Sequence, residues 1–237
     1  MSKRLLLFSN SYDYELGYLG HGIKEIKDFL GSIKRITFVP YALFDRDKYA
    51  GTVQDFFKKL GVDVLSLHET KHPENALEKA EALFVGGGNT FRLLRELHRL
   101  EIIANIRERI MQGMPYIGAS AGTIITCPTI RTTNDMPIVE IPTLDTLGII
   151  PFQINAHYID ADPNSRHMGE TREKRIEEYH EENDLPVLGL REGSWLRVEG
   201  EEIYLRSKKG AKLFLKGNPP LELDKEEDIS SRINKKI

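Results

Sequence analysis

The sequence predicts an α/β fold in which helices cover both faces of a largely parallel central sheet. Short apolar runs alternate with amphipathic stretches through much of the chain, the order of strands and helices that builds parallel sheets. Most of the predicted strands are continuously apolar, as expected for strands that are buried on both faces. With 237 residues, of which 40% are hydrophobic, the chain is long enough to bury such a sheet.

The individual elements follow from the spacing of the apolar residues. Short apolar runs predict strands over residues 5–8, 36–39, 83–85 and 115–118, and an alternating pattern predicts another over residues 62–67. Apolar side chains at helical spacing predict one helix over residues 52–60, which Gly61 ends, and another over residues 90–100. Strands and helices therefore alternate with short connections, as an α/β fold requires.

The pattern changes after about Val187. Four short strands joined by tight turns are predicted over residues 187–190, 194–198, 203–205 and 211–215, and Gly200 and Gly210 mark two of the turns. We expect these strands to extend the same sheet in an antiparallel sense. Because no linker or repeat interrupts the chain, we predict a single domain over residues 1–237.

Composition restricts the partners and the location. The net charge of −3 gives no indication of nucleic acid or an anionic membrane as a partner. The single cysteine, Cys127, cannot form an internal disulfide, and the apolar run near the N-terminus is too short for a signal or a membrane span. A cytoplasmic location is therefore the expectation, and a homodimer is compatible with the sequence.

Residues 118–122, which read GASAG, predict a nucleophile elbow with Ser120 at its tip. They follow a predicted strand and precede a short stretch that can begin a helix. Small neighbours allow the sharp turn that exposes the serine hydroxyl at the carboxyl end of a strand, and the backbone N–H of Ala121 would face a developing oxyanion. The alternative is a plain glycine-rich turn with an uninvolved serine.

A second glycine-rich turn, GGGNT at residues 86–90, also joins a predicted strand to a predicted helix. It lacks the lysine of a P-loop and the spacing of a dinucleotide fingerprint. We therefore predict that the N–H of Gly88 is a second oxyanion donor. Asn89 either contacts the substrate or only caps the helix.

His157 is the candidate base for Ser120, because it ends a strand-like segment beside a polar loop. The other histidines lie in charged, loop or N-terminal segments, at positions 21, 68, 72, 98, 167 and 180. An acid must orient the base, and three carboxylates qualify on position alone. They are Glu192, Asp160 and Asp135, and the residues themselves leave this choice open.

Several segments together resemble the peptidase E family of serine peptidases, which cleave dipeptides with an N-terminal α-linked aspartate. They are FVGGGNTFRLL, YIGASAGT, TTNDMPI, NAHYIDADP, HMGETREKRIEE and GLREGSWL, which span residues 84–196. The resemblance implies a three-layer α/β/α sandwich of the class I glutamine amidotransferase-like kind. It also implies a triad of Ser120, His157 and Glu192, with the N–H groups of Gly88 and Ala121 as oxyanion donors. Asp135 then becomes a residue of the substrate pocket.

An aspartyl substrate needs a cation for its carboxylate. Arg172 is the candidate, because a guanidinium binds a carboxylate in bidentate fashion; the alternative is that it pairs with a nearby glutamate of its own helix. Glu170 is a weaker candidate for the free α-amino group. The acidic and histidine-rich run from His157 to His167 lacks helical metal-ligand spacing, so we expect neither a metal nor a cofactor.

Three other functions are weighed against this one. A hydrolase resembling cyanophycinase, which cuts β-linked aspartyl polymers, would share the architecture. A class I glutamine amidotransferase would carry cysteine at the position of Ser120. A binding module without activity would lack a member of the triad, whereas all three residue types are present.

Overall fold

The computed structural model describes residues 2–162, 164 and 168–233. Its larger sheet has eight strands in the order β14-β11-β10-β1-β7-β6-β4-β5. Five of them are parallel, namely β1 (Arg4–Phe8), β7 (Tyr116–Ala119), β6 (Leu83–Val85), β4 (Arg35–Val39) and β5 (Asp63–Ser66). The largely parallel sheet predicted from the apolar runs is therefore confirmed.

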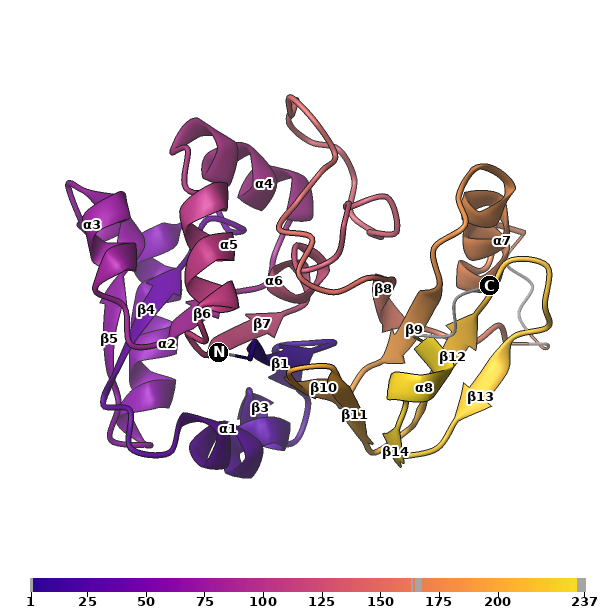
Figure 1. Ribbon diagram of the computed structural model, residues 1–237, viewed down its shortest axis with the longest axis horizontal. Helices are drawn as coiled ribbons and strands as arrows, with labels where there is room; N and C mark the ends of the chain where they lie inside the picture. Colours follow the sequence, from indigo (N-terminus) through magenta and orange to yellow (C-terminus); the bar gives the residue numbers. More distant parts are fainter. Residues whose placement is uncertain (1, 163, 165–167, 234–237) are drawn as a thin grey trace.

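Helices cover both faces of the parallel strands (Figure 1). One face carries α1 (Ile23–Leu30) and α2 (Arg46–Lys58), and the other carries α3 (Pro73–Glu78), α4 (Thr90–Arg99), α5 (Ile103–Met111) and α6 (Ala121–Ile124). Strand β1 shows why both faces must be covered: Leu5 and Leu7 pack into one apolar cluster, whereas Leu6 and Phe8 pack into the other. All four side chains are fully buried, as the continuous apolar pattern predicted.

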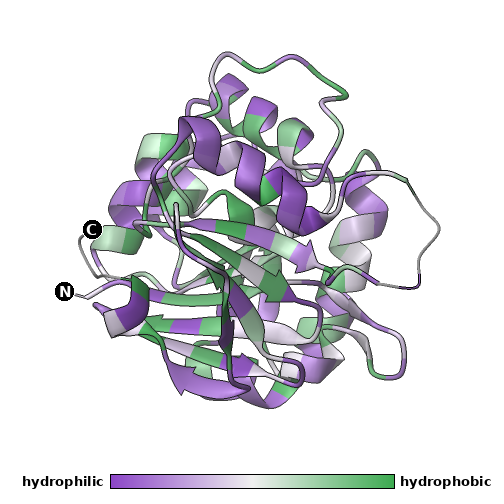
Figure 2. Cartoon of the chain, turned by 90° about the vertical axis from the view of Figure 1, so that its right-hand side faces the viewer, coloured by the Kyte–Doolittle hydropathy of each residue, from purple (hydrophilic) through white to green (hydrophobic). Residues whose placement is uncertain are grey.

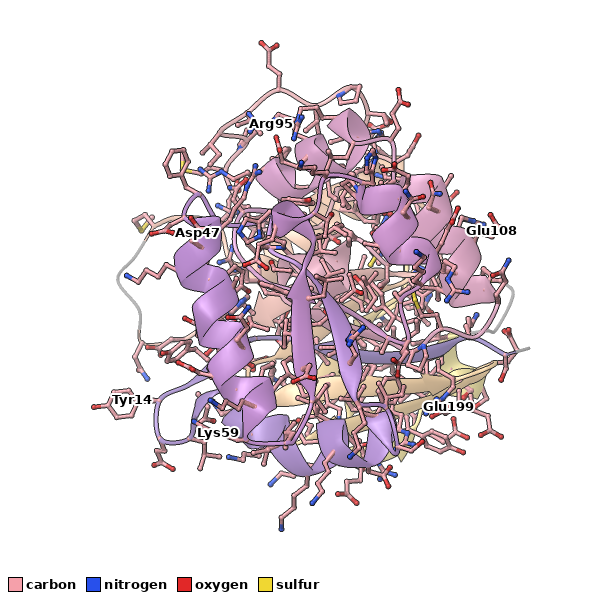
Figure 3. The ribbon with its side chains drawn as sticks, turned by 90° about the vertical axis from the view of Figure 1, so that its left-hand side faces the viewer. Tyr14, Asp47, Lys59, Arg95, Glu108 and Glu199 are labelled. Atoms are coloured by element: carbon pink, nitrogen blue, oxygen red, sulfur yellow. The ribbon has the colours of Figure 1, made fainter. Side chains whose placement is uncertain are left out.

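Helix α2 begins six residues earlier than the helix predicted over residues 52–60. Asp45 caps its first turn, because the Asp45 side chain accepts a hydrogen bond from the N–H of Lys48. In Figure 3, Asp47 and Lys59 lie near the two ends of α2, and Tyr14 projects away from the molecule. Polar residues thus lie outside, while the apolar stripe of α2 packs on the sheet.

The C-terminal strands divide between two sheets, which corrects the prediction of one extended sheet. Strands β10 (Ser194–Glu199), β11 (Glu202–Ser207) and β14 (Glu226–Asp228) extend the larger sheet in an antiparallel sense, as expected. A second sheet of four strands contains β13 (Leu221–Leu223), β12 (Ala211–Phe214), β9 (Val187–Arg191) and β8 (Gln153–Tyr158). Figure 2 shows hydrophobic and hydrophilic residues alternating along strands on this side of the molecule.

The chain passes from one sheet to the other at a corner of two residues, Glu192 and Gly193. Strand β9 pairs in parallel with β8, and after the corner β10 pairs with β1. Gly193 has a φ of 81°, which permits the sharp change of direction. Apolar runs and turns predict that strands exist but not which strands pair, so the division could not be predicted.

The remaining elements are short or peripheral. They are the hairpin β2 (Tyr12–Asp13) and β3 (Gly17–Tyr18), the 3-10 turns η1 (Gly20–Gly22) and η2 (Leu67–Glu69), α7 (Arg172–Glu182) and α8 (Ser230–Ile233). None of the helices in the described part of the chain has both the length and the apolar composition needed to cross a bilayer.

Candidate active site

Ser120 occupies a strained turn between β7 and α6. Its φ of 51° and ψ of −110° are unusual for a residue with a side chain. The two glycines of the motif are required by close contacts: a Cβ on Gly118 would lie 2.6 Å from the Gly122 carbonyl oxygen, and one on Gly122 would collide with the Val85 carbonyl oxygen. The predicted elbow is therefore present, and its glycines allow the backbone to pack against β6.

His157 lies between Ser120 and Glu192. Its Nε2 atom is 2.9 Å from the Ser120 Oγ atom, and its Nδ1 atom is 2.6 Å from the Glu192 Oε1 atom. In this order of contacts, the imidazole can take the proton of the serine hydroxyl, while the carboxylate fixes the tautomer of the imidazole. The three residues come from three separate segments, which the fold brings within hydrogen-bonding distance.

His157 and Glu192 are carried by the second sheet and its corner. His157 lies near the end of β8, at a bulge where the pairing of β8 with β9 changes register. Its φ of 55° is in the left-handed region, so the backbone is strained here as it is at Ser120. The side chains of His157 and Glu192 are 39% and 52% exposed, which leaves the imidazole accessible to a substrate.

Two backbone N–H groups are available beside Ser120. Within the described residues, neither Gly88 nor Ala121 has an acceptor for its N–H group. Ala121 is the first residue of α6, where helical geometry leaves the N–H free. Gly87 packs against the elbow, since a Cβ there would lie 3.1 Å from the Ser120 Cβ atom. Both predicted oxyanion donors thus belong to turns that adjoin Ser120.

Asn89 and Asp135 lie together at the N-terminus of α4. The Asn89 side chain accepts a hydrogen bond from Arg92 N, and its amide donates to the Met136 carbonyl oxygen over 2.9 Å. The Asp135 carboxylate accepts from both the N–H and the hydroxyl of Thr90, at 2.8 and 2.5 Å. Together these contacts fasten the loop around residue 135 to the turn that contains Gly88.

Asp160, another candidate for the acid, faces Arg191 instead of His157. The Arg191 guanidinium donates to both carboxylate oxygens of Asp160, at 2.7 and 2.9 Å. Its positive charge and hydrogen bonds lower the pKa of Asp160. Among the three carboxylates that the sequence left open, Glu192 is the one that contacts His157.

Arg172 begins α7 and borders a cavity of about 340 Å³ near the end of β8. Asp160, Asp162 and Glu170 line the same cavity. Burial and the nearby Arg175 lower the pKa of Arg172. In the part of the chain that the structure describes, no carboxylate forms an ion pair with Arg172, whereas Arg175 pairs with Glu170 over 3.6 Å.

A second cavity, of about 560 Å³, opens beside Gly87 and Gly88. Aromatic side chains form much of its wall, and Lys48 contributes a cation. It is lined by Ser11, Tyr12, Tyr18, Leu43, Phe44, Asp45, Lys48, Tyr49, Thr52, Gly87 and Gly88. Since Gly87 packs against Ser120, this cavity gives a ligand room beside the elbow on the side of α2.

The remaining predictions concern the histidines, a bound metal and the thiol of Cys127. His167, one of the histidines set aside as a base, lies outside the described residues. No group of three potential metal ligands is found among residues 2–162, 164 and 168–233. Burial raises the pKa of Cys127 to about 12, so this thiol is protonated and inert at neutral pH.

Ser9 and Asn10 are two residues of the site that the sequence analysis missed. Both are buried at the end of β1, and their side chains contact the segments that carry His157 and Glu192. Their position in the sequence could have revealed them. Polar residues that directly follow a buried parallel strand lie at the carboxyl edge of the sheet, where the binding sites of α/β proteins form.

Comparison with known proteins identifies the family. The model of Peptidase family S51 matches residues 5–206. The chain belongs to peptidase family S51. A protein of Streptomyces coelicolor named Peptidase E is 50% identical over 230 residues, which cover 97% of this chain and 95% of that protein. A Drosophila melanogaster protein named Probable alpha-aspartyl dipeptidase is 47% identical over 216 residues, 90% of each chain.

A solved structure supports the same conclusion for the fold. The crystal structure of a putative Peptidase E protein from Listeria monocytogenes matches with a TM-score of 0.67 and 25% sequence identity, over 87% of this chain and 99% of that one. The family resemblance predicted from the motifs of residues 84–196 is thus confirmed.

Proposed function

We propose that this S51 peptidase is a serine-type dipeptidase that hydrolyses dipeptides with an N-terminal α-linked aspartate. The contact that carries the proposal is the unbroken series from Ser120 through His157 to Glu192, with separations of 2.9 and 2.6 Å. The names of the relatives from Streptomyces and Drosophila support the substrate class. None of the comparisons favours the β-aspartyl polymer alternative.

In the first step, His157 takes the proton of Ser120 as the hydroxyl attacks the carbonyl carbon of the Asp-X bond. Glu192 keeps the proton of the imidazole on Nδ1, so that Nε2 is free to accept. The tetrahedral intermediate places its negative oxygen toward the N–H groups of Gly88 and Ala121. Loss of one such donor raises a barrier of this kind by roughly 3 kcal/mol.

Collapse of the intermediate releases the second amino acid. His157 donates the proton it has taken to the leaving amine, which leaves an aspartyl ester on Ser120. A water molecule then attacks the ester, and His157 accepts its proton. The same donors hold the second oxyanion, and free aspartate departs as the hydroxyl of Ser120 is restored.

Recognition of the aspartyl side chain is assigned to Arg172. It is a half-buried cation without an ion pair among the described residues, and it borders a cavity beside the segment that follows His157. A guanidinium in that position can bind a carboxylate with two hydrogen bonds. Asn89 and Asp135 act on the side of the oxyanion donors, where they hold the loop around residue 135 against the Gly88 turn.

We further propose that residues 1–237 act as one cytoplasmic catalytic domain without a metal or cofactor. A serine nucleophile, an imidazole base and backbone oxyanion donors supply each of the steps above from the chain itself. A homodimer remains a separate prediction, which gel filtration tests.

The direct test of the substrate class is hydrolysis of α-Asp-Leu beside Glu-Leu, Asn-Leu and the β-linked Asp-Leu isomer. We expect cleavage of α-Asp-Leu alone, because the pocket must match both the length and the charge of the side chain. Cleavage of the β-linked isomer in its place would move the function to the β-aspartyl alternative. Absence of all cleavage by folded protein would overturn the dipeptidase proposal.

The role of Arg172 is tested separately, with Arg175 as the matched control. The Arg172→Gln substitution should lower kcat/KM for α-Asp-Leu by about tenfold to a hundredfold, the usual effect of losing a charged hydrogen bond. Arg175→Gln removes a guanidinium from the same helix that already pairs with Glu170. Equal effects of the two substitutions would contradict the assignment.

A further inference from the structure

The end of β1 touches each of the three segments that carry the triad. The N–H of Ser120 donates to the Phe8 carbonyl oxygen over 3.0 Å. The Ser9 hydroxyl donates to the Leu190 carbonyl oxygen over 2.7 Å, two residues before Glu192. The Ser9 contact crosses from the larger sheet to the second sheet, so the end of β1 contacts both sheets.

Ser9 also accepts a hydrogen bond from the backbone of His157. The His157 N–H lies 2.9 Å from the Ser9 Oγ atom. His157 is the residue at the β8 bulge, where Ala156 pairs with Leu190 and Tyr158 already pairs with Arg191. A bulged residue loses its place in the ladder, and the Ser9 hydroxyl supplies the missing acceptor for its N–H group.

This hydrogen bond acts at a strained position. His157 has a φ of 55°, a conformation that a residue with a side chain keeps only where its surroundings hold it. Ser9 is fully buried, so water cannot replace its hydroxyl without rearrangement. The direction of the imidazole toward Ser120 therefore depends on a backbone conformation that Ser9 stabilises.

Asn10 holds the corner in a similar way. Its Oδ1 atom accepts a hydrogen bond from the N–H of Gly193 over 2.7 Å, and Gly193 directly follows Glu192. Its side-chain amide donates to the Tyr12 carbonyl oxygen over 2.6 Å, which fixes the orientation of the side chain. Ser9 thus holds the backbone of His157 itself, and Asn10 holds the residue that follows Glu192.

We propose that the Ser9 hydroxyl is a positioning residue for the triad, which holds the His157 bulge so that the imidazole lies between Ser120 and Glu192. Asn10 does the same for the Glu192 corner. Neither side chain touches the reacting atoms; each acts through the backbone of a triad segment. The inference rests on the proposed triad, and the experiment distinguishes a failure of the inference from a failure of the triad.

The test compares Ser9→Ala and Ser9→Cys with Ser66→Ala. The cysteine variant nearly keeps the size of serine but is a weak hydrogen-bonding partner, so it tests the hydroxyl with less risk to the fold. Ser66 is also fully buried, and its hydroxyl lies 2.8 Å from His68 Nδ1, away from the triad. It controls for the loss of any buried hydroxyl.

We expect kcat for α-Asp-Leu to fall about 100-fold in both Ser9 variants with KM unchanged, since a small misplacement of a catalytic group has effects of this size. Ser66→Ala should keep the wild-type kcat. In ¹⁵N NMR spectra, the His157 imidazole should change from one tautomer, protonated on Nδ1, to a mixture in the Ser9 variants. A His157→Gln spectrum assigns the resonance.

Folded Ser9 variants with wild-type kcat and a single His157 tautomer would overturn the proposal. So would a loss of activity in Ser66→Ala equal to that in Ser9→Ala, because the effect would then be general destabilisation. Ser120→Ala separates a failure of the proposed triad from a failure of the proposed role of Ser9. If Ser120→Ala keeps its activity, the triad itself is wrong, whatever the Ser9 variants do.

Discussion

The proposed nucleophile and its proposed base are held by different kinds of structure. Ser120 lies at the end of a strand inside the larger sheet, where glycines allow close backbone packing and the neighbouring residues are buried. His157 and Glu192 lie at the edge of the second sheet, with side chains that are 39% and 52% exposed. Packing fixes the first position, whereas hydrogen bonds fix the second.

Because of this difference, substitutions in the two regions should affect different properties of the protein, its stability in one case and its activity in the other. Changes at the elbow should disturb the packed core and therefore the free energy of unfolding. Changes at the edge of the second sheet should affect the reaction and leave the fold largely intact, because the side chains there bury little apolar surface. Substitutions in each of the two regions test this division.

The largest effect is expected for His157→Ala. Without a base, kcat for α-Asp-Leu should fall by about 10⁴-fold or more, as in other serine triads. The melting temperature should change little, since the backbone contact to Ser9 does not depend on the imidazole. Activity within tenfold of wild type would show that another group serves as the base.

Glu192→Gln should lower kcat by roughly 10³-fold, less than the approximately 10⁴-fold effect of replacing a fully buried triad acid. The reason is that Glu192 is half exposed, so water can partly replace its contact with Nδ1 of His157. Steady-state kinetics on purified protein measure the effect. A larger loss in Asp160→Asn than in Glu192→Gln would reverse the assignment of the acid.

Gly122→Ala tests whether packing holds the elbow at Ser120. Its added methyl group would collide with the Val85 carbonyl oxygen, so we expect a loss of roughly 3 kcal/mol in the free energy of unfolding. Gly51→Ala in α2 is the matched control, because open space surrounds its Cβ position and alanine favours a helix. Denaturant titration measures both; equal stabilities would contradict the packing explanation.

The smallest effect concerns the ion pair between Asp160 and Arg191. Arg191 lowers the pKa of Asp160 in the folded state, so the pair stabilises the fold above the unfolded pKa of aspartate. This contribution is lost as the pH falls through the lowered, folded pKa. Because Asp160 is half exposed, Asp160→Asn should cost only about 1 kcal/mol at neutral pH.

The pH dependence supplies the control for that prediction. Unfolding curves of wild type and Asp160→Asn should converge in acid, where the aspartate of the wild type is protonated. A difference in stability that stays constant from neutral pH into acid would show that the effect of the substitution is steric and not electrostatic.

The elbow could be predicted from the sequence because its determinants are local. Gly118, Ser120 and Gly122 lie within five residues, and the steric need for small neighbours is visible in the motif. The position of His157 at a strand end was also visible. Its left-handed backbone and the bulge were not, because they depend on Ser9, which is 148 residues away in the chain.

The pairing of the C-terminal strands could not be predicted for a similar reason. The sequence shows that β9 is continuously apolar and that β10 alternates, but not that β9 joins β8 while β10 joins β1. Which partner each strand takes is decided by the corner at Glu192 and Gly193 and by the contacts of Ser9 with both sheets. Such contacts exist only in the folded chain.

The most direct test of the central claim is to identify the residue that becomes acylated during turnover. The enzyme is mixed with aspartyl p-nitroanilide, quenched in acid and digested, and the peptides are analysed by mass spectrometry. We predict an aspartyl ester on the peptide that contains Ser120, and neither ester nor turnover in Ser120→Ala. An aspartyl group on another residue, or turnover by Ser120→Ala, would contradict the account.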